Sequence, residues 1–332
     1  MNIFKTLAAG TALAVAFIAA PAAAQDGTRI ALVVKSLGNG FFEAAHRGAQ
    51  EAAEELGDVE IIYTGPTAPT AEGQIEIITS LIAQNVDAIA VSANDPDALV
   101  PILQRAMDRG ITVISWDSGV APEGRQVHLN PSSNELIGRM CLQLAADHME
   151  NGEGNFAILS ATSTATNQNI WIEEMQSQLA DFPGLNLVDI VYGDDLADKS
   201  YREAQGLMTN YPDLDVIVAP TTVGILAASQ AVADADRIGE VYVTGLGLPS
   251  EMAGAIDSGA TKSFAIWNPI DLGYSATMIA YNLAAGNATG EPGSEIDMGR
   301  MGMLTVGENG EAAMAEPFVY DASNVHEFAS IF

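Results

Sequence analysis

The feature of this sequence that most constrains its fold is an alternation of short β-branched runs with longer segments of helical periodicity. One such segment, residues 71–84, places Ile75, Ile78 and Ile82 on a single helical face. Alternating strands and helices are typical of βαβ units, whose strands pair in parallel. The first series of predicted strands covers residues 30–34, 59–63, 88–92 and 112–116.

A second series of the same kind follows the first. Its predicted strands cover residues 156–159, 187–192, 216–219, 241–244 and 263–267. Because the chain has 332 residues, it is long enough for two domains of ordinary size, each with its own core. The pattern therefore predicts an α/β protein with two doubly wound parallel-sheet lobes. Cys141, the single cysteine, stands in an apolar stretch, which predicts a buried core residue.

The first 24 residues have the composition of a signal peptide. Lys5 is the only charge before an apolar run over residues 7–20, and Pro21 to Ala24 supply small residues for a cleavage site after Ala24. This run is shorter than the ~20 apolar residues that a membrane-spanning helix needs. An N-terminal membrane anchor is the alternative, but no stop-transfer pattern or polybasic flank follows. We therefore expect export to a bacterial periplasm.

The charge of the chain argues against one class of partner. Asp and Glu number 43 against 13 Lys and Arg, for a formal net charge of −30. Phosphate backbones would repel such a protein, and no basic stripe opposes that repulsion. We expect no nucleic acid partner. The acids are spread along the chain, so we interpret them as a solvated surface rather than as a cation-binding site.

The loops after the predicted strands carry the candidate ligand-binding groups. Ligands of open α/β sheets bind beyond the carboxyl ends of the strands. The three tryptophans of the chain, Trp116, Trp171 and Trp267, lie in or beside these loops, although core or hinge packing is the alternative role of each. The loops cover residues 35–42, 94–96, 116–118, 160–171, 220–222, 245–247 and 267–269.

Metal and nucleophile motifs do not occur in the sequence. No HExxH, CxxC, GxSxG or GxxxxGK[ST] pattern is present. The histidines have no partner at metal-ligand spacing; they are His46, His128, His148 and His326. The sequence therefore predicts no catalytic residue, no metal and no cofactor.

Two further patterns have plain structural interpretations. Gly245-Leu246-Gly247 lacks the third glycine of a dinucleotide-binding turn, so we interpret it as a strand-end turn. Asp194 and Asp195 lie between a predicted strand and a predicted helix, where capping and solvent exposure account for them better than acid-base catalysis.

Six short motifs at these loops are specific in combination, although each is weak alone. They are Gly-Asn-Gly-Phe-Phe at 38–42, Tyr-Thr-Gly-Pro-Thr at 63–67, Ser-Ala-Asn-Asp-Pro-Asp at 92–97, Ser-Trp-Asp-Ser at 115–118, Asn-Gln-Asn-Ile-Trp at 167–171 and Tyr-Pro-Asp-Leu-Asp at 211–215. Through them the chain resembles the ribose-binding-like periplasmic proteins for pentoses and hexoses. Within that family it is most similar to the rhamnose-binding and autoinducer-2-binding proteins.

This resemblance implies the periplasmic binding protein type I fold, with two similar lobes joined by a three-segment hinge. It implies an N-terminal lobe of residues 26–131 plus 269–300 and a C-terminal lobe of residues 132–268 plus 301–332. The implied ligand is a monosaccharide, and the implied partner is an ABC transporter permease in the inner membrane. A chemoreceptor is a further candidate partner, and we expect a monomer.

The candidate site residues offer the groups that a sugar needs. Asp117 can accept hydrogen bonds from two hydroxyls, with a helix cap or hinge contact as its alternative role, and Lys35 can donate to ring or hydroxyl oxygens. Phe41, Phe42 and Trp171 can cover the C–H faces of a ring. The other candidates are Asn39, Asn94, Asp95, Asn130, Asn167, Gln168, Pro220, Thr222, Leu246, Trp267 and Asn268.

Two positions bear on the choice of ligand. The autoinducer-2-binding proteins resemble this chain at Lys35, Asp117, Gln168 and Pro220. Their pattern has aspartate in place of Asn167 and alanine in place of Thr222. A site built for one set of hydroxyls rejects analogues that leave its polar groups unpaired. These differences favour a sugar such as rhamnose, with autoinducer-2 as the alternative.

Two rival functions stay open. Sugar-responsive repressors share the fold implied by the resemblance, but they need an N-terminal helix-turn-helix, and the predicted signal peptide occupies that place. A periplasmic enzyme that acts on sugars is the second rival, which the missing catalytic motifs oppose.

Overall fold

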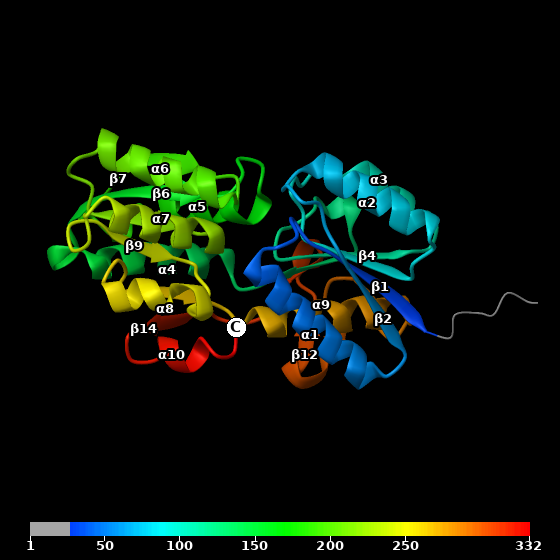
Figure 1. The fold of residues 1–332 in the computed structure, drawn as a ribbon. Coiled ribbons are helices and arrows are strands. Elements are labelled where there is room, and N and C mark those ends of the chain that lie inside the picture. Colours follow the sequence, from blue (N-terminus) through cyan, green and yellow to red (C-terminus); the bar gives the residue numbers. More distant parts are fainter. Residues whose placement is uncertain (1–26) are drawn as a thin grey trace, which may run out of the picture.

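The chain forms two lobes that lie side by side, each built on its own β-sheet (Figure 1). The computed structural model describes residues 27–332, so the predicted signal peptide, residues 1–24, lies outside the described residues. Within residues 27–332, no helix combines the length and the hydropathy needed to cross a membrane.

The N-terminal lobe contains a six-stranded sheet in which every neighbouring pair is parallel, in the order β13-β5-β4-β3-β1-β2. Four strands confirm the first predicted series: β1 (Thr28–Val33), β2 (Val59–Thr64), β3 (Ala88–Val91) and β4 (Thr112–Trp116). Sequence analysis does not predict β5 (Val127–Asn130) or β13 (Glu311–Ala313). β13, with three residues, is too short to show a clear period.

Helices cover both faces of this sheet. Ile30 and Leu32 of β1 face a core shared with α1 (Gly40–Leu56) and α9 (Pro269–Ala284). Ala31 and Val33 face a second core, built with α2 (Ala71–Ala83) and α3 (Val100–Met107). Burial on both faces explains why these strands read as continuous apolar runs rather than as an alternating pattern.

The close approach of α1 to α9 depends on a residue without a side chain. A Cβ atom on Gly48 of α1 would lie 1.7 Å from the carbonyl oxygen of Ile270 in α9. Only glycine fits at this contact. The close packing against α1 holds the start of α9, which follows the second hinge crossing.

The C-terminal lobe contains a four-stranded parallel sheet in the order β7-β6-β8-β9. Its strands are β6 (Gly154–Ser160), β7 (Leu185–Tyr192), β8 (Val216–Ala219) and β9 (Tyr242–Gly245). Helix α4 packs against α5, and α6 packs against α7. The helices of this lobe are α4 (Asn134–His148), α5 (Thr166–Gln178), α6 (Ala197–Asn210), α7 (Thr222–Asp234), α8 (Pro249–Ser258) and α10 (Val325–Phe328).

The last predicted strand of this lobe forms, but its main partner is antiparallel. Strand β10 (Ser263–Ile266) continues the parallel sheet only through one bridge, between Leu246 and Ala265. It pairs along its length with β14 (Phe318–Asp321), which runs in the opposite direction. Cys141 of α4 is fully buried, as predicted.

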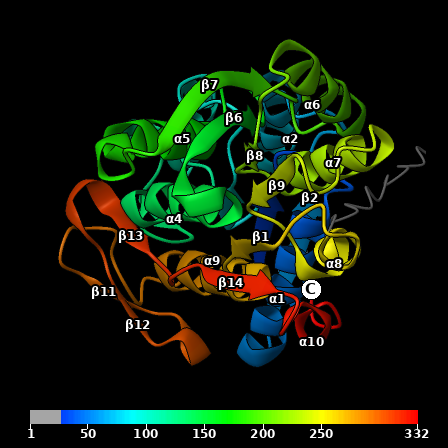
Figure 2. The same cartoon turned by 90° about the vertical axis from the view of Figure 1, so that its left-hand side faces the viewer.

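Three segments cross between the lobes: residues 131–133 after β5, residues 267–268 after β10, and residues 314–317 between β13 and β14. The expected boundary after residue 300 is wrong for the third crossing. Glu311–Ala313 pairs with His128–Asn130 in the first sheet, so the chain stays with the N-terminal lobe until after Ala313. Figure 2 shows β13 and β14 as successive parts of this last segment.

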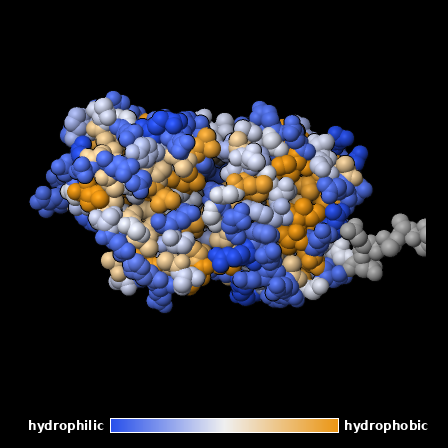
Figure 3. Space-filling model, viewed as in Figure 1, coloured by the Kyte–Doolittle hydropathy of each residue, from blue (hydrophilic) through white to orange (hydrophobic). Residues whose placement is uncertain are grey.

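The remaining elements are short. A hairpin of β11 (Glu295–Asp297) and β12 (Met303–Thr305) precedes β13. Single 3-10 turns cover Pro122–Gly124, Glu150–Gly152, Leu179–Asp181, Gly299–Met301 and Glu308–Gly310. The face drawn in Figure 3 carries many hydrophilic residues with apolar patches between them, which agrees with a solvated surface.

Candidate functional site

Loops from the carboxyl ends of both sheets enclose a cavity between the lobes. Residues from both lobes line it. Twelve of the sixteen candidate residues line it: Lys35, Asn39, Phe41, Phe42, Asp117, Asn167, Gln168, Trp171, Pro220, Thr222, Leu246 and Trp267. Asp195, Thr221 and Ile266 also line it.

A buried ion pair joins the lobes at this cavity. The side chain of Lys35, which follows β1, is 4% exposed, and that of Asp195, which follows β7, is 6% exposed. Lys35 Nζ lies 3.7 Å from Asp195 Oδ2 and 3.3 Å from Gln168 Oε1 on α5. An ammonium group buried alone would be strongly unfavourable. The two partners from the opposite lobe make its burial possible.

Asp117 lies at the end of β4 with a φ of 59°, in the left-handed region that aspartate tolerates better than most residues. Its carboxylate accepts a hydrogen bond from Ser92 Oγ at 2.7 Å and another from Asn167 Nδ2 at 3.1 Å. The second bond crosses from the other lobe. Burial raises the pKa of Asp117, and the Lys35 charge with these two donors lowers it in part.

Two amide side chains that line the cavity are held by hydrogen bonds from the backbone. Asn39 caps α1, where its Oδ1 accepts from the backbone N–H of Phe41 at 2.9 Å and lies 3.5 Å from Thr222 Oγ1 of the other lobe. On α5, Asn167 Oδ1 accepts from the backbone N–H of Gln168 at 3.0 Å. Side chains held in this way are oriented before a ligand binds.

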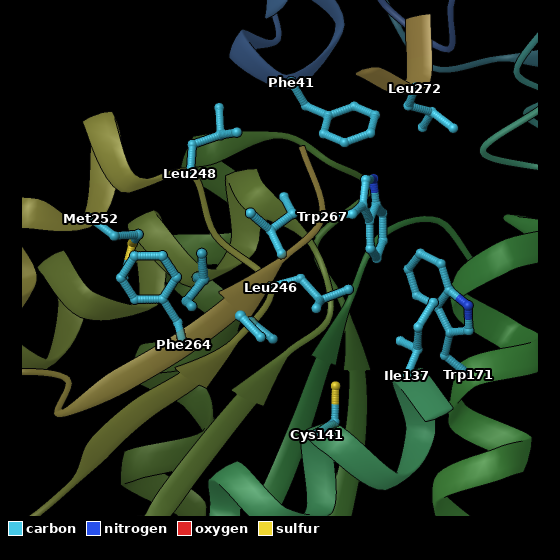
Figure 4. Packing of buried hydrophobic residues seen from close by; sticks show 14 of the residues in the cluster. Phe41, Ile137, Cys141, Trp171, Leu246, Leu248, Met252, Phe264, Trp267 and Leu272 are labelled. Atoms are coloured by element: carbon cyan, nitrogen blue, oxygen red, sulfur yellow. The ribbon is translucent and has the colours of Figure 1, made fainter. Parts of the chain in front are cut away.

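Aromatic rings form the other side of the cavity. Trp267 lies between Phe41 and Trp171 (Figure 4). Its ring centroid is 6.2 Å from that of Phe41 and 5.6 Å from that of Trp171, in edge-to-face arrangements. Trp171 Nε1 donates to Asn134 Oδ1 at 2.9 Å, which fixes the orientation of the indole. Trp116 packs behind this wall against Phe42 and does not line the cavity.

Four of the candidate residues, Asn94, Asp95, Asn130 and Asn268, do not line this cavity. Asn94 Nδ2 donates to the Lys35 carbonyl at 2.9 Å, so it shapes the loop that presents Lys35. Asp95 Oδ1 accepts from two backbone N–H groups that follow it and closes a turn. Their amide and carboxylate groups serve the backbone, which is a common use of these residues in loops.

The other two also satisfy local partners. Asn130 Oδ1 lies 3.1 Å from His128 Nε2 at the end of β5, in a separate cavity beside the first hinge crossing. Asn268 caps α9, with its Oδ1 accepting from the backbone N–H of Ile270 at 3.0 Å. Sequence position places all four near strand ends, but their side chains bond to neighbouring protein groups outside the cavity.

The cavity includes a carboxylate that sequence analysis assigned to the surface. The side chain of Asp195 is buried, pairs with Lys35 and accepts a hydrogen bond from Thr221 Oγ1, so the interpretation of exposure is wrong for this carboxylate. Its position after β7, at the carboxyl edge of the sheet, was the available signal. Asp194 beside it is part-exposed and pairs with Lys199.

Gly245 confirms the strand-end interpretation of the Gly245-Leu246-Gly247 segment. It ends β9 with a φ of 129°, and a Cβ there would lie 2.2 Å from the Ala219 carbonyl oxygen. The turn needs glycine so that Leu246 can reach the cavity wall.

Two of the histidines are buried and neutral. Burial lowers the pKa of His128 to about 3 and that of His148 to about 4. His128 Nδ1 lies 2.9 Å from Ser115 Oγ, and His148 Nδ1 lies 2.7 Å from the Leu144 carbonyl oxygen, so both serve the packing of strands and helices.

Fold and site together define a ligand-binding protein with two lobes. A family model described as a periplasmic binding protein domain matches residues 30–288. The chain therefore belongs to the periplasmic binding proteins. Proteins of this family bind solutes and do not transform them, so the chain is not an enzyme.

Individual relatives show the same relationship. The D-ribose/D-allose-binding protein of Pseudomonas aeruginosa is 30% identical over 224 residues, which cover 65% of this chain and 70% of the relative. A solute-binding protein of an ABC transporter from Clostridium phytofermentas, solved with bound L-rhamnose, matches with a TM-score of 0.88 at 36% identity. That match covers 92% of this chain and 99% of the solved one.

A third likeness concerns the fold alone. LsrB from Clostridium saccharobutylicum, solved in complex with AI-2, matches with a TM-score of 0.85 at 23% identity and covers 91% of this chain and 99% of its own. These matches confirm the predicted type I fold of two α/β lobes.

Proposed function

We propose that this protein is exported through residues 1–24, binds a monosaccharide in the cavity between its lobes, and delivers the sugar to an ABC transporter permease. L-rhamnose is the first candidate ligand. The observation that carries the proposal is the division of one interlobe cavity into a polar side, centred on Lys35, Asp117 and Asp195, and an aromatic side, centred on Trp171 and Trp267.

The polar side suits a ligand with several hydroxyls. A monosaccharide has about a dozen heavy atoms, so micromolar affinity, about −8 kcal/mol, requires a large contribution from each atom. The carboxylates of Asp117 and Asp195 can accept hydroxyl hydrogens, and Lys35 can donate to an oxygen. Hydrogen bonds in which one partner is charged are stronger than those between neutral groups. Because the protein supplies the charged groups here, a neutral ligand with several hydroxyls can form such bonds.

The other side of the cavity suits the apolar parts of a sugar. Trp171 and Trp267 can cover C–H faces of a pyranose ring. Leu246 and Ile266 add aliphatic surface to the same wall, and such surface fits the methyl group of a 6-deoxyhexose. The solved relative with bound L-rhamnose, at 36% identity over nearly the whole chain, supports this choice.

Autoinducer-2 is the second candidate. Lys35, Asp117, Gln168 and Pro220, the positions shared with the autoinducer-2-binding pattern, all line the cavity. Asn167 and Thr222, which depart from that pattern, line it as well. Two departures inside the cavity make the sugar the first choice.

A thermal-shift screen against L-rhamnose, D-ribose, D-allose and autoinducer-2 tests the proposal. At a hundredfold excess over its dissociation constant, a bound ligand stabilises the protein by about 2.7 kcal/mol. We expect L-rhamnose to raise the melting temperature most and to be recovered unchanged. A screen in which no sugar shifts the melting temperature, or in which a sugar is converted, would overturn the proposal.

A further inference from the structure

Two hydrogen bonds join the lobes outside the cavity described above. Thr164 Oγ1 donates to the Asn94 carbonyl at 2.9 Å, and Thr166 Oγ1 donates to the Gly119 carbonyl at 2.8 Å. Both threonines belong to the segment between β6 and the first turn of α5 in the C-terminal lobe, whereas both acceptors follow strands of the N-terminal lobe. Neither threonine is among the residues that line the cavity.

The loop that carries the Asn94 carbonyl is held in place by a buried side chain. Gln74 is fully buried; its Oε1 accepts from the Asn94 backbone N–H at 2.9 Å, and its Nε2 donates to the carbonyls of Val34 and Ser92. The Asn94 side chain also donates to the Lys35 carbonyl. The N-terminal lobe therefore presents the Asn94 carbonyl from a cross-linked loop. When the lobes separate, this carbonyl loses the hydrogen bond from Thr164.

We propose that Thr164 and Thr166 form an interlobe latch that sets the affinity for every ligand by stabilising the closed arrangement of the lobes. The proposal rests on the proposed function, because it assumes that ligands bind between the lobes. The equilibrium affinity of a ligand that is held between closed lobes rises with the stability of the closed arrangement. Contacts made only in the closed arrangement therefore raise affinity without touching the ligand.

The chemistry of the two contacts gives the size of the effect. Removing one hydroxyl loses a hydrogen bond of ordinary strength, a change of about fivefold in an equilibrium. Thr166 is less exposed than Thr164, so its loss should be felt more. We expect Thr166→Val to weaken binding about fivefold, Thr164→Val two- to threefold and the double variant about tenfold.

Uniformity across ligands distinguishes a latch from a contact residue. Titrations with L-rhamnose, D-ribose and autoinducer-2 should show the same fractional loss in the double variant for each probe that the wild type binds. Thr79→Val is the matched control, because Thr79 Oγ1 donates within its own helix to the Ile75 carbonyl at 2.7 Å. Losses that differ more than threefold among the probes, or no loss beyond twofold for any, would overturn the latch.

Rates give a second readout. Stopped-flow tryptophan fluorescence should show faster dissociation in the double variant, by about the factor lost in affinity, with an association rate within twofold of the wild type. A slower association with unchanged dissociation would contradict a latch that acts after the ligand has entered.

A distance measurement on the protein without added ligand separates failure of the latch from failure of the proposed function. Spin labels on Gln104→Cys of α3 and Glu173→Cys of α5 report the separation of the lobes, and both positions are exposed. Cys141 will not take a label, because it is buried and burial raises the pKa of its thiol to about 12. The double variant should shift the distance distribution towards longer values, and an unchanged distribution would overturn the latch even if no sugar binds.

Discussion

Removing the Asp117 carboxylate should nearly abolish ligand binding while leaving the fold intact. The carboxylate is 3% exposed and already accepts from Ser92 and Asn167. A charged acceptor contributes about 1.5–3 kcal/mol per hydrogen bond. If one or two ligand hydroxyls donate to it, Asp117→Ala should lose about 3–4 kcal/mol, or roughly a hundredfold to a thousandfold in dissociation constant.

Titration calorimetry with L-rhamnose measures this loss directly. Asp117→Asn keeps the shape of the side chain but not its charge, so we expect a smaller loss, roughly tenfold to a hundredfold. Asp236→Ala is the matched control, because Asp236 also has a left-handed φ, at 54°, but lies on an exposed turn after α7. Binding by Asp117→Ala within threefold of the wild type would refute the role of the carboxylate.

The same residue predicts a pH dependence with a definite sign. Burial raises the pKa of Asp117 above the ordinary value of about 3.9 for aspartate. As pH falls through this raised pKa, the carboxylate becomes protonated and can no longer accept from two hydroxyls, so affinity should fall. Folding favours the protonated form of this carboxyl group. Its contribution to the free energy of unfolding is therefore fully present below the unfolded pKa and is lost as pH rises through the folded pKa. Asp117→Asn should remove the acid limb of the affinity profile, and an unchanged profile would contradict the assignment.

Three further predictions concern the aromatic wall, ligand choice and the helix contact. Ligand should change the intrinsic fluorescence, and Trp171→Phe should remove much of that change; a variant with the full signal would exclude Trp171 from ligand contact. The wild type should bind L-rhamnose at least tenfold more tightly than autoinducer-2, a difference of about 1.4 kcal/mol. In calorimetry, the double change Asn167→Asp and Thr222→Ala should weaken sugar binding, because each change removes a hydrogen-bond donor from the cavity. Gly48→Ala should lower the free energy of unfolding by about 1–3 kcal/mol through overpacking, whereas Gly206→Ala, which meets no atom within 4 Å, should not lower it in chemical denaturation.

The sequence pattern predicts strands that are buried on both faces, such as β1 and β4, because such strands are apolar along most of their length. It does not predict β13, whose three residues Glu311–Ala313 carry no pattern and find their place only by pairing with β5. The position of the third crossing therefore depends on tertiary pairing.

The site shows the same division between local and tertiary information. Strand-end position correctly brings Lys35 and Asp117 to the cavity, because parallel strands meet at one edge of a sheet. It cannot separate them from Asn94, whose side chain donates to the Lys35 carbonyl, or from Asn268, whose side chain caps α9. It also misses Asp195, because burial of that carboxylate depends on Lys35 from the other lobe.

Titration calorimetry of the wild type with L-rhamnose, run in parallel with Asp117→Ala, tests the central claim most directly. We predict one binding site per chain, a dissociation constant in the micromolar range or tighter, and loss of the binding heat in the variant. Absence of binding to any monosaccharide by the wild type, or equal binding by both proteins, would contradict a sugar site between the lobes.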